Sequence, residues 1–350
     1  MNAIVNVVNV VNALRGRNRE PGPASKTDIE LKQRAVKFDW KETPIDWLPN
    51  EPFTSYFINE INLILPEGEF WFCRLYNKAL PMITDEKLRE DVRGFIKQEA
   101  MHARGHNTAT DEYLAQRGIN PERNRAVMKY LFNVMLDDKP FGKTLPKWAE
   151  KQWLLARLGL IATIEHLTCV LGMYALENKH WDELGADPVL LDLIRWHGAE
   201  EVEHRSVAFD LYQHLGGSYF SRYYMTLLVF PMIFGIWVDG AANLMSQDQR
   251  LAKHKPAFYK PWVWVNWFKE SRRGLLPSPL WLAYRTLPYF SPWYDPSHEG
   301  STELAAEYLA NSPAAKAATT VAAAAQAGKT AALQAAQPCA QAVPGAATMA

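Results

Sequence analysis

Two copies of one short motif, Glu-x-x-His, constrain what this chain can fold into. Glu99 and His102 form one copy in the stretch EAMHARGHN, and Glu201 and His204 form the other in RWHGAEEVEHRSVAFDLY. Residues three apart share one face of a helix, and in both stretches that face continues as an apolar stripe. A buried carboxylate is costly unless a partner balances it. The motif therefore predicts metal binding inside a helical core.

A lone glutamate precedes each motif by about one helical hairpin. Glu69 lies in GEFWFCRLY, upstream of Glu99, and Glu165 lies in LIATIEHLTCVLG, upstream of Glu201. One glutamate from each of two helices, with one Glu-x-x-His from each of the other two, is the ligand set of four-helix dinuclear carboxylate proteins. The order predicts an all-α fold, a ferritin-like four-helix bundle with a dinuclear metal site in its core.

Charge balance and ligand type indicate which metals to expect. Four carboxylates match the charge of two divalent ions, so burial of the filled site carries little net charge. Carboxylate and imidazole ligands suit iron and manganese, whereas a structural zinc site is commonly built with thiolates. We therefore predict two metal ions, iron in the first place and manganese as the alternative.

Further histidines and glutamates lie close to the two motifs. His197 precedes Glu201 by one helical turn on the same stripe, and we predict that it is a ligand. His106 follows His102 by one turn, and it is either a ligand or a partner of a ligand carboxylate. Glu200 and Glu203 flank the stripe and are expected to point outward or to support the ligands. The predicted metal ligands are Glu69, Glu99, His102, Glu165, His197, Glu201 and His204.

Turn and breaker residues divide the chain. Pro66 is expected in the first turn of a helix that carries Glu69, because a proline there loses no helical hydrogen bond. The four helices are expected within 54–81, 85–117, 146–178 and 188–217, with a long crossover between the second and the third. The predicted parts are a flexible lead-in and arm (1–50), the metal-binding bundle (51–218), additional C-terminal helices packed on it (219–300), and an Ala-rich disordered tail (301–350).

Composition excludes some classes of protein. Lys plus Arg and Asp plus Glu number 38 each, without the basic cluster of a nucleic-acid-binding surface. Three cysteines make no disulfide framework, which predicts a cytoplasmic protein. The apolar segment 225–238 contains Pro231 and Gly235 and is shorter than the roughly 20 residues of a membrane span. It is expected to be a buried helix, with contact at a membrane surface as the alternative.

The residues from about Pro66 to Tyr212, including EAMHARGHN and WHGAEEVEHRSVAFDLY, resemble the bacterial family of predicted metal-dependent hydrolases. That resemblance implies a metal-activated water that attacks the substrate. The ligand order also resembles that of the di-iron arylamine N-oxygenases, which have a third histidine where His197 stands here. This second resemblance implies O2 as a co-substrate and an electron donor as a partner.

These observations lead to three functional hypotheses. The first is O2-dependent oxidation of a small apolar or aromatic substrate by a di-iron oxidoreductase, in which the protein holds the metals and excludes water. The alternative is a metal-dependent hydrolase in which two metals lower the pKa of a bound water. Iron storage or a purely structural bundle is the third. The residue pattern names neither a catalytic group beyond the metal centre nor the oligomeric state.

Overall fold

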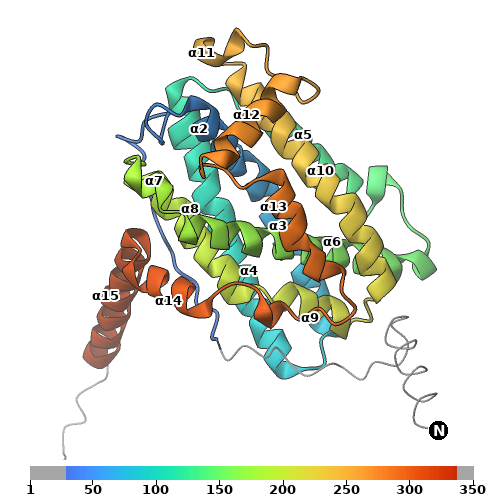
Figure 1. The fold of residues 1–350 in the computed structure, drawn as a ribbon. Coiled ribbons are helices and arrows are strands. Elements are labelled where there is room, and N and C mark those ends of the chain that lie inside the picture. The colour runs from blue at the N-terminus through green and yellow to red at the C-terminus, as the bar shows by residue number, and fades with distance from the viewer. Residues whose placement is uncertain (1–28, 337–350) are drawn as a thin grey trace, which may run out of the picture.

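The computed structural model describes residues 29–336, and every regular element in this range is a helix or helical turn (Figure 1). Residues 1–28 and 337–350, which include the ends of the predicted lead-in and tail, lie outside the described part. The α-helices are α2 (Pro52–Asn59), α3 (Ile61–Ala79), α4 (Glu86–Thr108), α5 (Glu122–Tyr130), α6 (Lys147–Glu177), α7 (His180–Glu183), α8 (Pro188–His204), α9 (Val207–His214), α10 (Tyr219–Met245), α11 (Gln249–Ala252), α12 (Pro261–Arg272), α13 (Pro279–Thr286), α14 (Thr302–Asn311) and α15 (Pro313–Ala336).

Two helical hairpins, α3 with α4 and α6 with α8, form the core that carries the predicted ligands. Short turns join the helices within each hairpin, and a long crossover containing α5 joins the hairpins. Asp85 caps α4 by accepting a hydrogen bond from Leu88 N, and Asp187 caps α8 by accepting from Leu190 N. The predicted all-α bundle is confirmed.

Two of the four helices change their geometry near the C-terminal end. The predicted helix 85–117 is α4, followed by a π-helical turn (Ala109–Leu114) and a 3-10 turn that ends at Gly118 with φ of 82°. The predicted helix 188–217 is interrupted at Arg205, after which α9 continues. The buried Arg205 guanidinium donates to Pro296 O and Thr302 Oγ1, so the interruption coincides with an anchor for the C-terminal segment.

Pro66 lies inside α3 rather than in its first turn, so the predicted helix start was wrong. Proline has no N–H to donate to the carbonyl four residues earlier, which here belongs to Asn62. The Thr110 hydroxyl lies 2.7 Å from Asn62 O and donates to it instead. This contact from the π-helical turn compensates the proline, and the helix continues to Glu69 without a break.

Two glycines bring α6 and α8 unusually close together. A Cβ atom at Gly172 would lie 2.8 Å from Gly198 Cα, and a Cβ atom at Gly198 would lie 2.7 Å from Gly172 Cα. Any larger residue at either position would push the two backbones apart. The contact lies two turns beyond Glu165 and one turn beyond Thr168 on α6, and next to His197 on α8, so it sets the spacing of the ligands on this hairpin.

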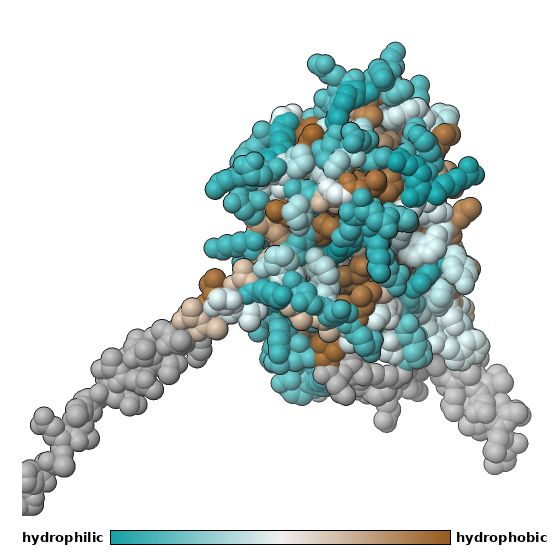
Figure 2. Space-filling model, turned by 60° about the vertical axis from the view of Figure 1, so that its left-hand side comes forward, coloured by the Kyte–Doolittle hydropathy of each residue, from teal (hydrophilic) through white to brown (hydrophobic). Residues whose placement is uncertain are grey.

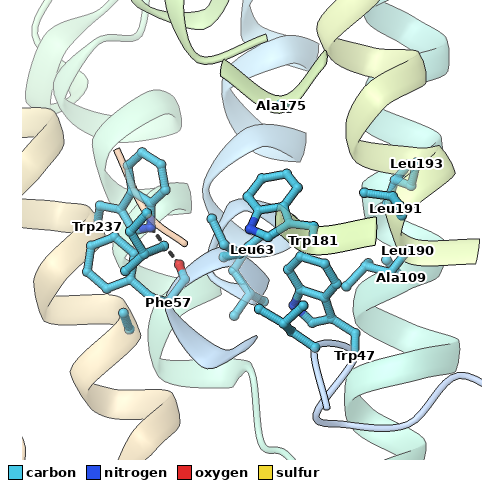
Figure 3. Close-up of a cluster of buried hydrophobic side chains, with 14 of the residues drawn as sticks. Trp47, Phe57, Leu63, Ala109, Ala175, Trp181, Leu190, Leu191, Leu193 and Trp237 are labelled. Carbon is cyan, nitrogen blue, oxygen red and sulfur yellow. Dashed lines mark hydrogen bonds between the residues drawn. The ribbon is translucent and has the colours of Figure 1, made fainter. Parts of the chain in front are cut away.

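Aromatic side chains fill the core on the side of α2, α7 and α10 (Figure 3). Trp47 and Trp181 make an edge-to-face contact with ring centroids 5.5 Å apart. The Trp237 indole donates to Phe57 O at 2.7 Å, so the polar edge of this buried ring is satisfied. A second apolar cluster, around Tyr76 and including helix α9, packs on the opposite side of the ligands.

The N-terminal arm and the C-terminal helices both lie against α8. The arm, residues 29–51, buries Trp40 and Trp47. Residues 302–318 differ from the predicted disordered tail, because α14 and the start of α15 pack on α8. The reason lies partly in Asp192, a buried carboxylate on α8 that accepts from Tyr308 Oη and from Ala314 N. Composition alone did not show that α8 offers these acceptors.

Candidate metal centre

The seven predicted ligands converge inside the four-helix core, each at most 6% exposed. Around His204, the ring Nε2 lies 3.5 Å from Glu99 Oε1, 3.4 Å from Glu165 Oε2 and 3.2 Å from Glu201 Oε2. The four side chains come from α4, α6 and α8. The helix faces that carry these ligands therefore meet at one point in the core.

The other side of the centre is built around His102 and His197. His102 Nδ1 lies 3.4 Å from Glu99 Oε1 and 3.6 Å from Glu201 Oε1. His197 Nε2 lies 2.6 Å from Glu201 Oε1 and 3.7 Å from Glu69 Oε1. Glu99 and Glu201 thus approach histidines on both sides of the centre, as bridging carboxylates would.

The donor atoms form two compact groups of the size a metal ion needs. Within each group, one ligand atom per residue lies within 4.8 Å of the others. The first group has two imidazoles and the second has one, so the two positions differ in nitrogen content. The groups are Glu69, His102 and His197, and Glu99, Glu201 and His204.

The unsatisfied atoms at this centre fit two metal ions. Both carboxylate oxygens of Glu69 and of Glu99, His102 Nδ1 and His204 Nε2 have no hydrogen-bond partner within the described protein. An unsatisfied buried polar group costs about 1–3 kcal/mol, and more when it is charged. Lone pairs that converge without donors are the arrangement that a cation stabilises. The donor set, carboxylate and imidazole without thiolate, suits iron or manganese.

Burial and crowding change the protonation of the ligands in the metal-free protein. Burial raises the pKa of Glu69 well above its usual value, and the charge of Glu99 adds to this effect. Burial also raises the pKa of Glu165, with a further contribution from Glu201. Metal binding must displace these protons, so metal binding and proton release are linked.

His106 lies behind His197 rather than in either group. Its Nε2 is 2.6 Å from His197 Nδ1, and its Nδ1 is 2.8 Å from Asn62 Oδ1. The amide oxygen can only accept, so His106 donates from Nδ1 and accepts from His197 at Nε2. This fixes the tautomer of His197 and turns its Nε2 lone pair towards the centre. Two roles were predicted for His106, and the geometry supports the second, in which it hydrogen-bonds to a metal ligand. The ligand that it contacts is His197 and not a carboxylate.

His102 is held from behind by charged groups. Its Nε2 lies 3.0 Å from Glu200 Oε2, and Glu200 also accepts from Arg34 and from the Trp196 indole. Arg34 makes two further hydrogen bonds to Glu203, at 2.8 Å and 2.9 Å. Glu200 and Glu203 are both buried, so they support the ligands and do not point outward.

Arg34 and Asn62 are the supporting residues that the sequence analysis missed. Arg34 comes from the arm, which has no helical period, and its contacts join residues more than 160 positions apart. Asn62 lies in the turn before Pro66, where the sequence suggested a helix boundary. The cluster of glutamates around the second motif could have indicated a basic partner such as Arg34. Glu200 and Glu203 need a positive charge nearby when α8 is buried.

An apolar cavity opens onto one side of the centre. It offers about 140 Å³ to the centre of a water molecule and is bounded by α3, α5, α6, α8 and α10. Its ionisable lining residues are all ligand candidates or His106. The rest of the lining is almost entirely apolar and includes Ile61, Ile64, Phe72, Leu131, Phe132, Leu160, Ile164, Leu171, Met232, Ile233 and Ile236.

Residues 29–336 form an all-helical fold with two buried carboxylate–histidine groups that could each hold a metal ion. Residues 32–300 match the family model described as predicted metal-dependent hydrolase, so the chain belongs to that family. Neither the curated proteins nor the solved structures contain a match. The relationship to ferritin-like oxygenases therefore stays a prediction that rests on ligand order.

Proposed function

We propose that this protein is a dinuclear metal-dependent hydrolase that cleaves an ester or amide bond in a small, largely apolar molecule. The observation that carries the proposal is the cavity, which is apolar along its length and ends at Glu69, Glu165 and Glu201. An acyl or aromatic group fits such a lining, and the scissile bond would then lie at the carboxylate end. Membership of the hydrolase family supports the same reaction class.

The chain's own residues hold and shield the reacting centre. Two bound metals would supply Lewis acidity and lower the pKa of an attacking water. Glu99 and Glu201 keep the two positions together, and the Thr168 hydroxyl, 2.5 Å from Glu201 Oε2, restrains that carboxylate. The apolar lining excludes bulk water, which strengthens the electrostatic interactions inside.

Ester cleavage under anaerobic conditions tests this proposal. Metal-loaded protein should hydrolyse p-nitrophenyl esters without O2, with kcat/KM rising as the acyl chain is lengthened to fill the cavity. Chelation should abolish the activity, and Leu131→Asp should remove the chain-length preference because it places a charge in the apolar lining. If metal-loaded protein cleaves neither these esters nor the corresponding amides, the proposal is contradicted.

A second candidate function is O2-dependent oxidation of an apolar substrate by a di-iron centre. The specific observation in its favour is the nitrogen asymmetry, with His102 and His197 in one group and only His204 in the other. A hydrolytic pair gains little from an extra neutral ligand, whereas an oxygen-activating pair can use unequal metals. Rapid mixing of anaerobically iron-loaded protein with O2 should then give O2 uptake and a transient absorbing species. His197→Ala should alter the lifetime of that species while the fold is retained.

A further inference from the structure

The outer side of α10 is apolar although it faces solvent. Phe220, Tyr224, Leu227 and Leu228 recur at helical spacing and are 48%, 66%, 51% and 60% exposed. A surface helix normally presents polar residues to water. By length and composition α6 and α10 could each cross a membrane, but the most apolar window of α6 is 72% buried in the protein and that of α10 only 39%. Among the described residues, 29–336, nothing covers this side of helix α10.

The apolar surface continues from α10 onto α12 and α13. Of 21 exposed large apolar residues in the described range, 13 lie between positions 220 and 293, which marks one region of the fold. The Tyr223 ring contacts Phe290 at 5.2 Å, and Tyr219 donates to Phe290 O, so the segment after α13 adjoins α10. Figure 2, by contrast, shows a side where hydrophilic groups predominate. We name as the docking face Phe220, Tyr223, Tyr224, Leu227, Leu228, Val265, Phe268, Leu280, Tyr284 and Leu287.

Positive charge accompanies this apolar face. Residues 249–294 contain eight Lys and Arg and one acid, Glu270, whereas the whole chain has no net charge. Three of the eight pair with acids outside this range: Arg250 with Asp46 and Asp248, Arg273 with Glu51, and Arg285 with Glu299. Glu270 is buried and pairs with Arg273. Lys269 and Arg272 are exposed and follow Val265 and Phe268 on the outer side of α12, and three more exposed lysines precede α12 (Lys253, Lys255 and Lys260).

We propose that the docking face binds the surface of an anionic phospholipid bilayer. Aliphatic side chains enter the acyl boundary, Tyr and Trp are favoured at the headgroup level, and basic residues attract anionic lipids. A second copy of the chain fits less well, because a twofold interface places a surface against itself. The exposed Lys253, Lys255, Lys260 and Arg272 would then oppose their own copies.

The cavity approaches the surface beside α10, the helix that carries part of the docking face. Met128 and Ile236 line both the cavity and a second hollow between α5 and α10, so the cavity approaches the surface there. Val127, in the wall of that second hollow, is 40% exposed. An acyl-chain substrate could therefore pass from the membrane to the metal centre. This consequence rests on the proposed function, whereas docking itself does not.

Co-sedimentation with vesicles tests the docking face. The purified protein should pellet with phosphatidylcholine vesicles that contain about one third phosphatidylglycerol, and much less with pure phosphatidylcholine or at high salt. The double variant Leu227→Asp/Leu228→Asp should lower the binding at least tenfold, and Lys255→Glu/Lys260→Glu should lower it several-fold. Trp148→Asp is the matched control, because this α6 residue is 76% exposed outside the docking face; its binding should be unchanged.

Two results would overturn the docking proposal. One is wild-type protein that stays in the supernatant with anionic vesicles. The other is a dimer in solution that Leu227→Asp/Leu228→Asp converts to a folded monomer, which would assign the face to a second copy. Metal-free protein should bind vesicles as well as loaded protein, so a failure of ester cleavage with intact binding counts against the proposed function alone.

Discussion

His102 and His197 belong to the same group of ligands, but the contacts behind their rings differ in charge. Behind His102 stand Glu200 and Arg34, a carboxylate paired with a guanidinium. Behind His197, the described residues place two neutral groups, His106 and Asn62. Burial lowers the pKa of both rings, but the hydrogen bond to Glu200 and the negative charges of Glu99 and Glu200 outweigh this at His102 and raise its pKa well above the usual value, while the pKa of His197 stays lowered.

This difference shows two ways of orienting a metal ligand in a buried core. A carboxylate behind an imidazole increases its basicity and strengthens its bond to the metal. That arrangement needs a counter-charge, and Arg34 from the arm supplies it. The neutral hydrogen-bonded pair His106 and Asn62 fixes the orientation and the tautomer of the His197 ring without adding charge. We infer that His102 contributes more to metal affinity, whereas His197 mainly sets geometry.

The largest loss of bound metal is expected on removing a carboxylate that approaches both groups of ligand atoms. Glu99→Ala or Glu201→Ala should lower bound metal from about two ions per chain towards none, because each approaches histidines on both sides. Glu69→Ala, which contacts only the His197 side, should retain about one ion. Elemental analysis of the three purified variants makes the comparison. A full complement in Glu99→Ala and Glu201→Ala would remove these residues from the ligand list.

Breaking the charged support should have the next largest effect. Glu200→Gln keeps the shape of the side chain but removes the charge that faces His102 and leaves Arg34 less compensated. We expect metal affinity to fall by about 10- to 100-fold, as is typical when a partner behind a ligand is lost. Competition with a chelator of known affinity measures the change. Glu177→Gln, an exposed site on α6, is the control and should not differ from wild type.

Changing the neutral residues behind His197 should lower metal affinity less than changing the charged residues behind His102. His106→Gln removes the acceptor imidazole behind His197 but retains a polar side chain, and we expect affinity to fall by no more than about 10-fold. Asn62→Asp places a carboxylate behind His106 and should make the two supports more alike. The same chelator competition tests both variants. A loss in His106→Gln larger than that in Glu200→Gln would reverse the assigned roles.

Stability of the metal-free protein should fall as pH rises above about 7. Glu69, Glu165 and His102 have raised pKa values in the folded protein, so the folded state holds protons that the unfolded chain has already released. His197 and Glu201 have lowered pKa values and change stability only at lower pH, where stability rises with pH. Thermal unfolding at pH 7 and pH 9 should show a decrease without metal and none with metal bound. An equal decrease in both samples contradicts the linkage.

The ligands could be predicted from the sequence because metal-binding residue types occur at helical spacing within apolar stripes. Glu69, Glu99, Glu165 and Glu201 each interrupt an apolar stripe, and such a residue in a core needs a partner. The arm contact of Arg34 had no local signal, since it depends on how the chain passes over α8. Pro66 was misplaced for a similar reason: Thr110, which satisfies the freed carbonyl, comes from a distant part of the chain. Local pattern thus predicted helices and ligands but not contacts made across them.

Metal content and metal–metal distance in the loaded wild-type protein test the central claim most directly. Elemental analysis should give two ions per chain, and X-ray absorption should show a metal neighbour at about 3.5–4 Å, the separation of two-metal sites. The ligand shell should consist of oxygen and nitrogen without sulfur. A single ion per chain, or two ions with no metal neighbour at that distance, would contradict the dinuclear centre.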